Sequence, residues 1–567
     1  MSFSRQFPHS QPIFLATLLY FVATDVWPLS PATLTSPGGV SPDNISFAAG
    51  ATLFDPLLKG YFALDSAVDA SAPCVKGSFD LYTVNGAGYV LTCTAGPIFG
   101  AVAGKNIVIV KETVNGTAAG IHQTAIREPE AGFPKIIDHA NWLPDPAFFA
   151  NCSAPVLVPS VAPYVSYNSY TCTEPLHDTV VPNVSLSEED PTLWSGIYPV
   201  TSKDAQEFQK LRSKTQSVFQ TPYALVVSKP LRDLLQQAEG LLQNSETSKD
   251  VPSLTSAQVR AILSGQLTVW ENLWVWNETS KKEVQVVTTG FTPVHICRRA
   301  DSSGVQVAAN AHFFSRGCLT WNGGGSIVTS DNPSAQFAGE TWTASSAQIN
   351  AFSFAAATSQ DLVKCVAAGA SSSDTRYRIG FVSTNVNPFN LGFQLPPGSS
   401  DIRYIRLDEQ VPSIWAIQKG QYRWFMEPTI QYTCCNLPPS PFIPSLPASL
   451  RQNFPNYALG NRKLIWDTLI RYLGNANVLA ALNQSSQQST FLFNDIAPNH
   501  IAASDSGFLT LGNHQISFPP GPSTPDWPGA IRAIGVAGKG PNSNLSKTFP
   551  GQPVNNCNPA FQINPGQ

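Results

Sequence analysis

The residues best suited to chemistry in this chain form a basic, hydroxyl-rich phrase, Arg298 to Val305, which reads Arg-Arg-Ala-Asp-Ser-Ser-Gly-Val. A β-rich run, Val284 to Thr289, precedes it, and Val307 to Phe314 predicts a short helix after it. A strand, a Ser/Gly turn and a helix start would place unpaired backbone N–H groups and the positive end of a helix dipole together. Such an arrangement favours the binding of an anion, and the guanidinium of Arg299 could donate two hydrogen bonds to it. A solvated surface turn with a serine cap is the alternative that the spacing leaves open.

Motifs for catalysis or metal binding are missing from the sequence. It contains no Gly-x-Ser-x-Gly, no His-Glu-x-x-His and no paired-carboxylate arrangement. His295 and His312 flank the anion phrase, but a strand histidine and a helix histidine are more often structural. The glycine run from Asn322 to Gly325 lacks the Lys-Ser/Thr of a P-loop and indicates a turn. With no Cys-x-x-Cys pair and scattered histidines, we expect no zinc site, no cofactor and no enzyme.

A second strand–turn–helix pattern lies near the start of the folded region. Ile45 to Gly50 predicts a short strand, Ala51 to Leu53 a small-residue turn, and Leu57 to Phe62 a helix. The pattern offers the same anion geometry as the first, although, taken alone, it favours a tight-packing turn.

The elements that must position these turns alternate between strands and helices. Expected strands are Tyr89–Cys93, Ile107–Lys111, Tyr223–Ser228, Tyr377–Val382, Arg403–Leu407 and Gln421–Met426. Expected helices are Leu231–Leu242, a helix capped by Thr255 and Gln258, Ser359–Ala368, and Asn461–Gly474. This alternation predicts α/β lobes with a mostly parallel sheet.

The composition favours an exported protein. Charged residues make up 13% of the 567 residues, against roughly 25% in a typical soluble domain, and proline is abundant at 47. A net charge of −4 and the absence of a basic run exclude nucleic acid as a partner. Arg5 precedes an apolar run, Ile13 to Ala23, which predicts a signal peptide at 1–27, with an uncleaved membrane anchor as the rival interpretation.

Ten cysteines in an exported chain predict disulfides. Neighbouring cysteines suggest the pairs Cys74–Cys93, Cys152–Cys172 and Cys297–Cys318, although the sequence does not fix the connectivity. Asn-x-Ser/Thr sequons would carry glycans only in a host that glycosylates them, and they begin at Asn44, Asn115, Asn151, Asn183, Asn277, Asn483 and Asn544.

Four phrases, in order along about 45–385, resemble the periplasmic phosphate-binding proteins of ABC transporters. Ala49–Leu53 is similar to the family's Gly-Ala-Gly-Ala-Thr-Phe, and Ile262–Leu273 to its Ile-Phe-x-Gly-x-Ile-x-x-Trp-x-Asp. Arg298–Val305 is close to Arg-Arg-x-Asp-Gly-Ser-Gly-Thr, and Ile379–Val382 is similar to Ile-Gly-Tyr-Val. The chain would then be a long, divergent relative.

The resemblance implies an α/β, two-lobed type II periplasmic binding-protein fold, with hinge strands, a ligand cleft, loop-rich insertions and a C-terminal tail. Its matching positions imply a ligand-binding set of Thr52, Leu53, Arg299, Asp301, Ser303, Gly304 and Val305. Arg299 would be the charged clamp and Asp301 its orienting partner. Leu53 replaces the family's Phe, and Val305 replaces a hydroxyl donor.

The family also uses a carboxylate that accepts a hydrogen from protonated phosphate, within a Ser-Asp-x-Pro phrase. The nearest candidate here is Thr171 to Pro175, where Cys172 or Thr173 takes the Asp position and Glu174 is adjacent.

The implied divisions are a signal peptide or anchor (1–27), lobe 1 (42–215), lobe 2 with the anion motif (216–384), a return to lobe 1 (385–500) and a loop-rich extension (501–567). The implied function is an exported, periplasmic or secreted protein that captures phosphate or a similar oxyanion, with an ABC transporter or a cell-surface assembly as partner. The alternative is an extracellular structural or adhesive protein that reuses the fold. A third possible function is that of a phosphatase, because some relatives of the fold are reported as phosphatases.

Overall fold

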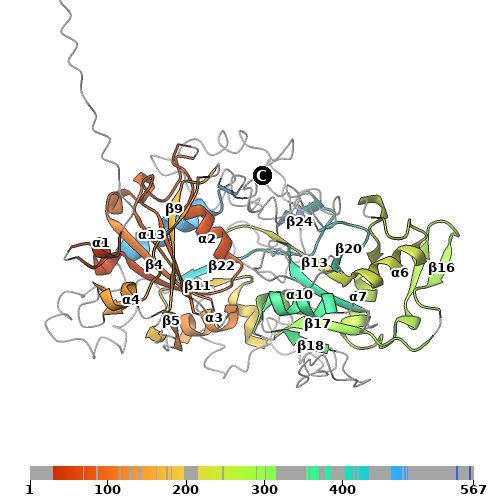
Figure 1. Ribbon diagram of the computed structural model, residues 1–567. Helices are drawn as coiled ribbons and strands as arrows, with labels where there is room; N and C mark the ends of the chain where they lie inside the picture. Colours follow the sequence, from red (N-terminus) through yellow and green to blue (C-terminus); the bar gives the residue numbers. More distant parts are fainter. Residues whose placement is uncertain are drawn as a thin grey trace, which may run out of the picture.

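Two large β-sheets with their helices form the body of the computed structural model, and they lie beside each other in Figure 1. Four two-stranded sheets accompany them in the described part of the chain. No helix of the part that the structure describes is long and apolar enough to cross a membrane. The expected segment at 1–27 lies outside that part, as does nearly all of 501–567. The structure describes residues 30–36, 38–67, 69–84, 87–113, 116–126, 130–134, 136–138, 143–160, 163–173, 177–180, 182–196, 215–245, 248–288, 290–300, 302–314, 353–356, 358–368, 377–384, 402–412, 416–417, 420–432, 461–475, 478–479, 482, 545–546 and 561–562.

The first sheet has the strand order β12-β22-β11-β1-β4-β3-β2-β9-β8. Its central strand β1 pairs in parallel with β4 and β11, and alternate residues enter two different cores: Ala48 on one face, Phe47 and Ala49 on the other. The strands are β1 (Ile45–Gly50), β2 (Asp80–Val84), β3 (Gly88–Thr94), β4 (Asn106–Glu112), β8 (Val156–Val158), β9 (Tyr167–Cys172), β11 (Val184–Ser187), β12 (Thr215–Ser217) and β22 (Thr429–Tyr432).

Helices from opposite ends of the chain cover one face of this sheet. The apolar side chains of α2 (Phe54–Phe62) and α13 (Asn461–Leu473) share one core with that face. Trp466 of α13 donates from Nε1 to the hydroxyl of Ser46 in β1, at 2.6 Å. A segment more than 400 positions away therefore holds the central strand.

The second sheet has the order β14-β20-β13-β19-β17-β18, and β21 also pairs with β13. The helices α6 (Lys229–Glu239), α7 (Ser256–Leu263), α8 (Gly304–Phe314) and α10 (Ser359–Ala368) surround it. The strands are β13 (Thr221–Ser228), β14 (Ser253–Leu254), β17 (His295–Arg299), β18 (Ser353–Ala356), β19 (Arg378–Ser383), β20 (Ile402–Leu407) and β21 (Phe425–Met426).

Local signals explain several of these elements. The capping box predicted for Thr255 and Gln258 is present at the start of α7. Helix α6 ends at Gly240, whose φ of 75° is the left-handed conformation that glycine adopts most readily. The predicted capping box is confirmed, and the helix expected at Leu231–Leu242 is present with the bounds Lys229–Glu239.

Two antiparallel segments carry the chain between the sheets. The first leads from β12 through 218–220 into β13, and the second leads from β21 through 427–428 into β22. They are joined by the Val218 amide, which donates to the carbonyl of Pro428 at 2.9 Å, and by Gln220 Nε2, which donates to Glu427 Oε1 at 3.0 Å. These segments take the place of the expected hinge strands; the boundary placed between 384 and 385 stays a prediction.

Both sheets are mixed, so the expectation of a mostly parallel sheet is wrong. β13 is antiparallel to β19, β20 and β21, and β22 is antiparallel to β11 and β12. For the pairs β12–β22 and β13–β21, the reversal follows from the crossings, because a strand that brings the chain back must run against the strand that brought it out.

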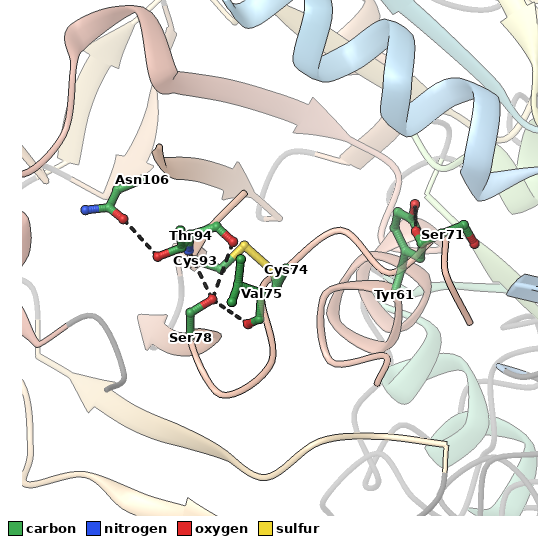
Figure 2. The surroundings of a disulfide bond; sticks show 8 residues. All are labelled: Tyr61, Ser71, Cys74, Val75, Ser78, Cys93, Thr94 and Asn106. Atoms are coloured by element: carbon green, nitrogen blue, oxygen red, sulfur yellow. Dashed lines mark hydrogen bonds between the residues drawn. A yellow bond between two sulfur atoms is a disulfide. The ribbon is translucent and has the colours of Figure 1, made fainter. Parts of the chain in front are cut away.

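Three disulfides join described residues. Cys74–Cys93 and Cys152–Cys172 confirm the neighbour pairing, and Figure 2 shows the first bond beside the hydrogen bond from Ser78 to the carbonyl of Val75. Cys297 bonds Cys365, not Cys318, so that expectation is wrong. α10 packs on β17, which brings the two Cα atoms to 5.9 Å, and distance in space rather than in sequence decides the pairing.

Two of the sequon asparagines are buried and engaged in the fold. Asn44 Nδ2 donates to the carbonyl of Asn106, and Asn277 Nδ2 donates to the carbonyl of Ala238. The folded chain does not present these two amides to solvent.

The corrected disulfide can be mapped directly. Digestion of the unreduced protein should release one linked peptide pair that contains Cys297 and Cys365, which separates after reduction. Because the bond closes a long loop, Cys365→Ala should lower the free energy of unfolding by about 2–4 kcal/mol. A linked pair of Cys297 with Cys318 would contradict the assignment.

Candidate functional site

The anion phrase forms a strand end, a short turn and a helix start. β17 supplies Arg299 as its last residue, and α8 begins at Gly304. The strand that leads into the phrase is therefore 295–299. Of the expected run 284–289, only 284–285 lie in a strand, the end of β16 (Lys282–Gln285), which pairs with β15 (Trp274–Asn277). The helix begins three residues before Val307. The amides of Gln306 and Val307 donate to the carbonyl of Ser303, which fixes the first turn. The positive end of the helix dipole thus lies beside Arg299.

Arg299 is almost completely enclosed, with 9% of its surface exposed. Its Nη1 donates to Ser359 Oγ at 2.6 Å, and its Nε donates to the carbonyl of Ala356 at 3.3 Å. Burial lowers the pKa of the guanidinium, while the carboxylates of Glu188 and Asp361 raise it. β18 and α10 therefore hold this cation in place.

A carboxylate from the first sheet meets this helix start. Glu188 follows the last residue of β11 and is 4% exposed. Its Oε2 lies so close to Gly304 that a Cβ atom on Gly304 would overlap it, which explains the glycine at this position. Burial raises the pKa of Glu188 to about 7, although the charge of Arg299 acts in the opposite direction.

Further acidic residues follow Glu188 in the same segment. Glu189 and Asp190 are fully buried, and burial together with its two acidic neighbours raises the pKa of Glu189 well above its usual value. The backbone of Glu189 is fixed, since its carbonyl accepts a hydrogen bond from Thr429 Oγ1 at 2.7 Å. The segment is therefore anchored to the crossing strand β22.

The second predicted turn lies next to this acidic segment. The Ala51 amide donates to the carbonyl of Leu186 at 2.7 Å, and Lys111 Nζ donates to the carbonyl of Gly50 at 2.9 Å. Leu53 is buried in the first core, whereas Thr52 is exposed. Leu53 can therefore offer a ligand only its backbone.

A third helix start joins the two turns. α3 (Gly116–Ile126) follows β4, and its Ala118 amide donates to the carbonyl of Ser302. At Gly120, a Cβ atom would lie 2.6 Å from the Cα of Gly50, so α3 packs directly on the end of β1. α3 thus contacts elements of both sheets.

The structure brings Arg299, Ser303 and Gly304 together with Glu188. Val305 is buried in the second core, where an apolar side chain fits. Asp301 lies outside the described residues. His312 stacks on Trp424, with ring centroids 5.6 Å apart, which supports its structural interpretation.

In the candidate phrase Thr171 to Pro175, Glu174 and Pro175 lie outside the described residues. β9, which ends at Cys172, is separated from β1 by β4, β3 and β2. Sequence reasoning missed Glu188 to Asp190, although the signal was present: a short strand ends in Ser187, and acidic residues and Pro191 follow. No cluster of His, Cys, Asp or Glu that could hold a metal occurs among the described residues.

Comparisons with known proteins give distant structural likenesses. No family model and no curated protein matches the chain. It is similar to a phosphate ABC transporter substrate-binding protein from Clostridium perfringens, solved with bound phosphate (12% identity, TM-score 0.34, 77% of this chain and 98% of that one). It is also similar to an ABC-type phosphate transport receptor from Vibrio cholerae (12% identity, TM-score 0.29, 75% of this chain and 98% of that one). A third similar structure is PstS from Borrelia burgdorferi (9% identity, TM-score 0.28, 77% of this chain and 97% of that one). Identities and TM-scores this low carry no argument about the ligand.

The protonation of Glu188 should appear in the stability of the protein. A folded-state pKa of about 7, above the usual 4.5, means that the folded state binds a proton that the unfolded state has lost between these values. The stability contributed by Glu188 is therefore complete below about pH 4.5 and is lost as the pH rises through 7. Glu188→Gln stays neutral at every pH. In denaturant titrations, the free energy of unfolding of this variant should therefore decrease less between pH 5 and 8 than that of the parent, by on the order of 2 kcal/mol. Glu283→Gln, at an exposed position, should leave the profile unchanged.

Proposed function

We propose that this chain is an exported binding protein that holds a small oxyanion, such as phosphate, between its two sheets. The observation that carries the proposal is the enclosure of Arg299 beside the first turn of α8, where the first sheet also contributes. A buried guanidinium is costly unless it binds something negative, and a helix start adds to the attraction for an anion.

The proposed ligand contacts are those that the sequence phrases imply. The backbone at Thr52 and Leu53 would bind from the first sheet. From the second sheet, Arg299 would be the charged clamp, oriented by Asp301, and the remaining contacts would come from Ser303, Gly304 and Val305. The division of the chain into two lobes, at 42–215 with 385–500 and at 216–384, belongs to the same proposal. Within 385–500, β20 and β21 pair with β13 of the second sheet, so the chain returns to the first sheet only after β21. Three disulfides favour an oxidising compartment and therefore export.

One observation favours the alternative of an extracellular structural or adhesive protein. Glu188 already offers Arg299 a negative charge from within the chain. An internal pair of this kind can hold two sheets together with no ligand at all. The two functions differ in whether an external anion can bind in an Arg299-dependent way.

Calorimetry with inorganic phosphate distinguishes these functions. We expect saturable binding by the disulfide-intact chain, weakened about 10- to 100-fold in Arg299→Ala, because a charged hydrogen-bonding group contributes roughly 1.5–3 kcal/mol. Arg299→Lys should recover only part of the affinity, since lysine keeps the positive charge but lacks the planar guanidinium that can donate two parallel hydrogen bonds.

Arg260→Ala is the matched control, because it removes an exposed arginine from α7 in the same half of the molecule. Phosphate binding equal in Arg299→Ala and Arg260→Ala, or absent from the parent protein at every pH, would contradict the proposal and favour the structural alternative.

A further inference from the structure

Two tryptophans lie side by side on the solvent face of the small sheet formed by β15 and β16. Trp274 and Trp276 are 50% and 51% exposed, while Val275 between them is buried in the second core. Side chains alternate along a strand, so both indole rings lie on the outer face, with their Cα atoms about 7 Å apart. Single exposed hydrophobic residues are ordinary, but two large rings next to each other form a continuous apolar patch.

The neighbouring strand places hydrogen-bonding groups beside both rings. In the antiparallel register, Gln285 lies opposite Trp274, and Glu283 lies opposite Trp276. Opposed residues have Cβ atoms about 4.5–5.5 Å apart, so each tryptophan has a polar side chain as its neighbour across the sheet. Glu283 is exposed, and Gln285 is held by its Nε2, which donates to the carbonyl of Glu271. These four side chains, Trp274, Trp276, Glu283 and Gln285, are called the tryptophan face below.

The backbone beneath the tryptophan face is fixed at both ends of β15. Gln258 Nε2 of α7 donates to the carbonyl of Trp274 at 2.7 Å, and Asn277 Nδ2 donates to the carbonyl of Ala238 in α6 at 2.7 Å. A surface held in this way loses little conformational freedom when a ligand binds. Figure 1 shows β16 at the outer end of the second sheet, on the side away from the first.

The size of the tryptophan face argues against a protein partner. The exposed halves of the two rings offer on the order of 250 Å² of surface. Each partner in a stable protein complex buries about 800 Å², which is several times more. A narrow ligand fits this area better than a second folded chain.

The charge of the hairpin argues against a membrane and against any strongly charged ligand. Between Trp274 and Gln285 the charged residues cancel, since they are Glu278, Lys281, Lys282 and Glu283. Lys281 and Glu278 already form an ion pair at 2.6 Å. Without a net positive charge, the hairpin does not attract anionic lipid. Burying the ring of Trp276 in lipid would also bring the carboxylate of Glu283 towards the hydrocarbon, which is costly.

We propose that the tryptophan face binds a neutral, β-linked glycan chain. A sugar ring with equatorial hydroxyls has an apolar C–H face that packs on an indole, and hydroxyls at its edge that donate to a carboxylate or amide oxygen. Two indoles in line along β15 suit an extended chain whose units follow one another. Glu283 and Gln285 lie where the hydroxyls would be. This binding would be separate from the proposed anion site and would not depend on it.

Calorimetry with cellohexaose tests the proposal on the disulfide-intact full chain. We expect saturable binding that is weakened at least about tenfold in Trp274→Ala and in Trp276→Ala, because a few aromatic anchors carry most of the energy of an interface. Trp276→Tyr should keep most of the affinity, since an aromatic face remains. Both positions are exposed, so the melting temperatures of these variants should match that of the parent and exclude unfolding as the cause.

Two further variants serve as controls. Leu157→Ala removes a side chain that is 66% exposed in β8, at the edge of the first sheet, and should bind cellohexaose like the parent. Arg299→Ala should also bind cellohexaose like the parent while it loses phosphate. Failure of the glycan site and failure of the oxyanion site are therefore seen in separate titrations. Maltohexaose, whose α-linkages coil the chain, should bind at least about tenfold more weakly than cellohexaose.

Several results would overturn the glycan site. Cellohexaose and chitohexaose that both fail to bind, or that bind the two tryptophan-to-alanine variants as tightly as the parent, would contradict it. Tighter binding of polygalacturonate would contradict a neutral ligand. Binding to phosphatidylcholine vesicles, with or without phosphatidylserine, that is lost in Trp276→Ala would assign the tryptophan face to a membrane. Self-association that is lost in the same variant would assign it to a second copy of the chain.

Discussion

The meeting of Glu188 with Arg299 and the start of α8 constrains the arrangement of the two sheets. Each charge is buried by its own half of the molecule, and neither could be left alone there at small cost. Arg299 is fixed by Ala356 and Ser359, and the segment after Glu188 is fixed by Thr429. Because the guanidinium of Arg299 and the backbone just after Glu188 are each held by hydrogen bonds, the pair constrains how the end of β11 and the end of β17 face each other.

Glycine makes this close approach possible. Gly304 leaves room for the Glu188 carboxylate, and Gly120 lets α3 pack directly on Gly50. With larger residues at these points, the starts of α3 and α8 could not come together with the end of β1. The converging helix starts supply positive potential, and the acidic segment at Glu188 supplies the opposite sign. At the place where the two sheets meet, the partial positive charges of the helix starts therefore lie close to the negative charges of the acidic segment.

Local features of the fold could be predicted from the sequence, and long-range features could not. The capping box at Thr255 and the buried strand around Val226 depend on neighbouring residues, so their patterns suffice. The pairing of Cys297 with Cys365 and the antiparallel crossings depend on contacts between distant segments, which no local pattern specifies. Arg299 could be singled out as a candidate from the sequence because it lies in a distinctive phrase. Glu188 was missed because its importance arises only when β11 is placed beside β1.

The bond between Cys297 and Cys365 also determines the result of proteolysis between these two cysteines. The polypeptide from 297 to 365, with β17, α8 and β18, forms a covalent ring closed through sulfur. A protease that hydrolysed one peptide bond inside this ring would produce two polypeptides that remain one molecule. The strand that ends in Arg299 and the helix that holds its guanidinium would stay tethered, so a nicked chain keeps the parts of the junction together.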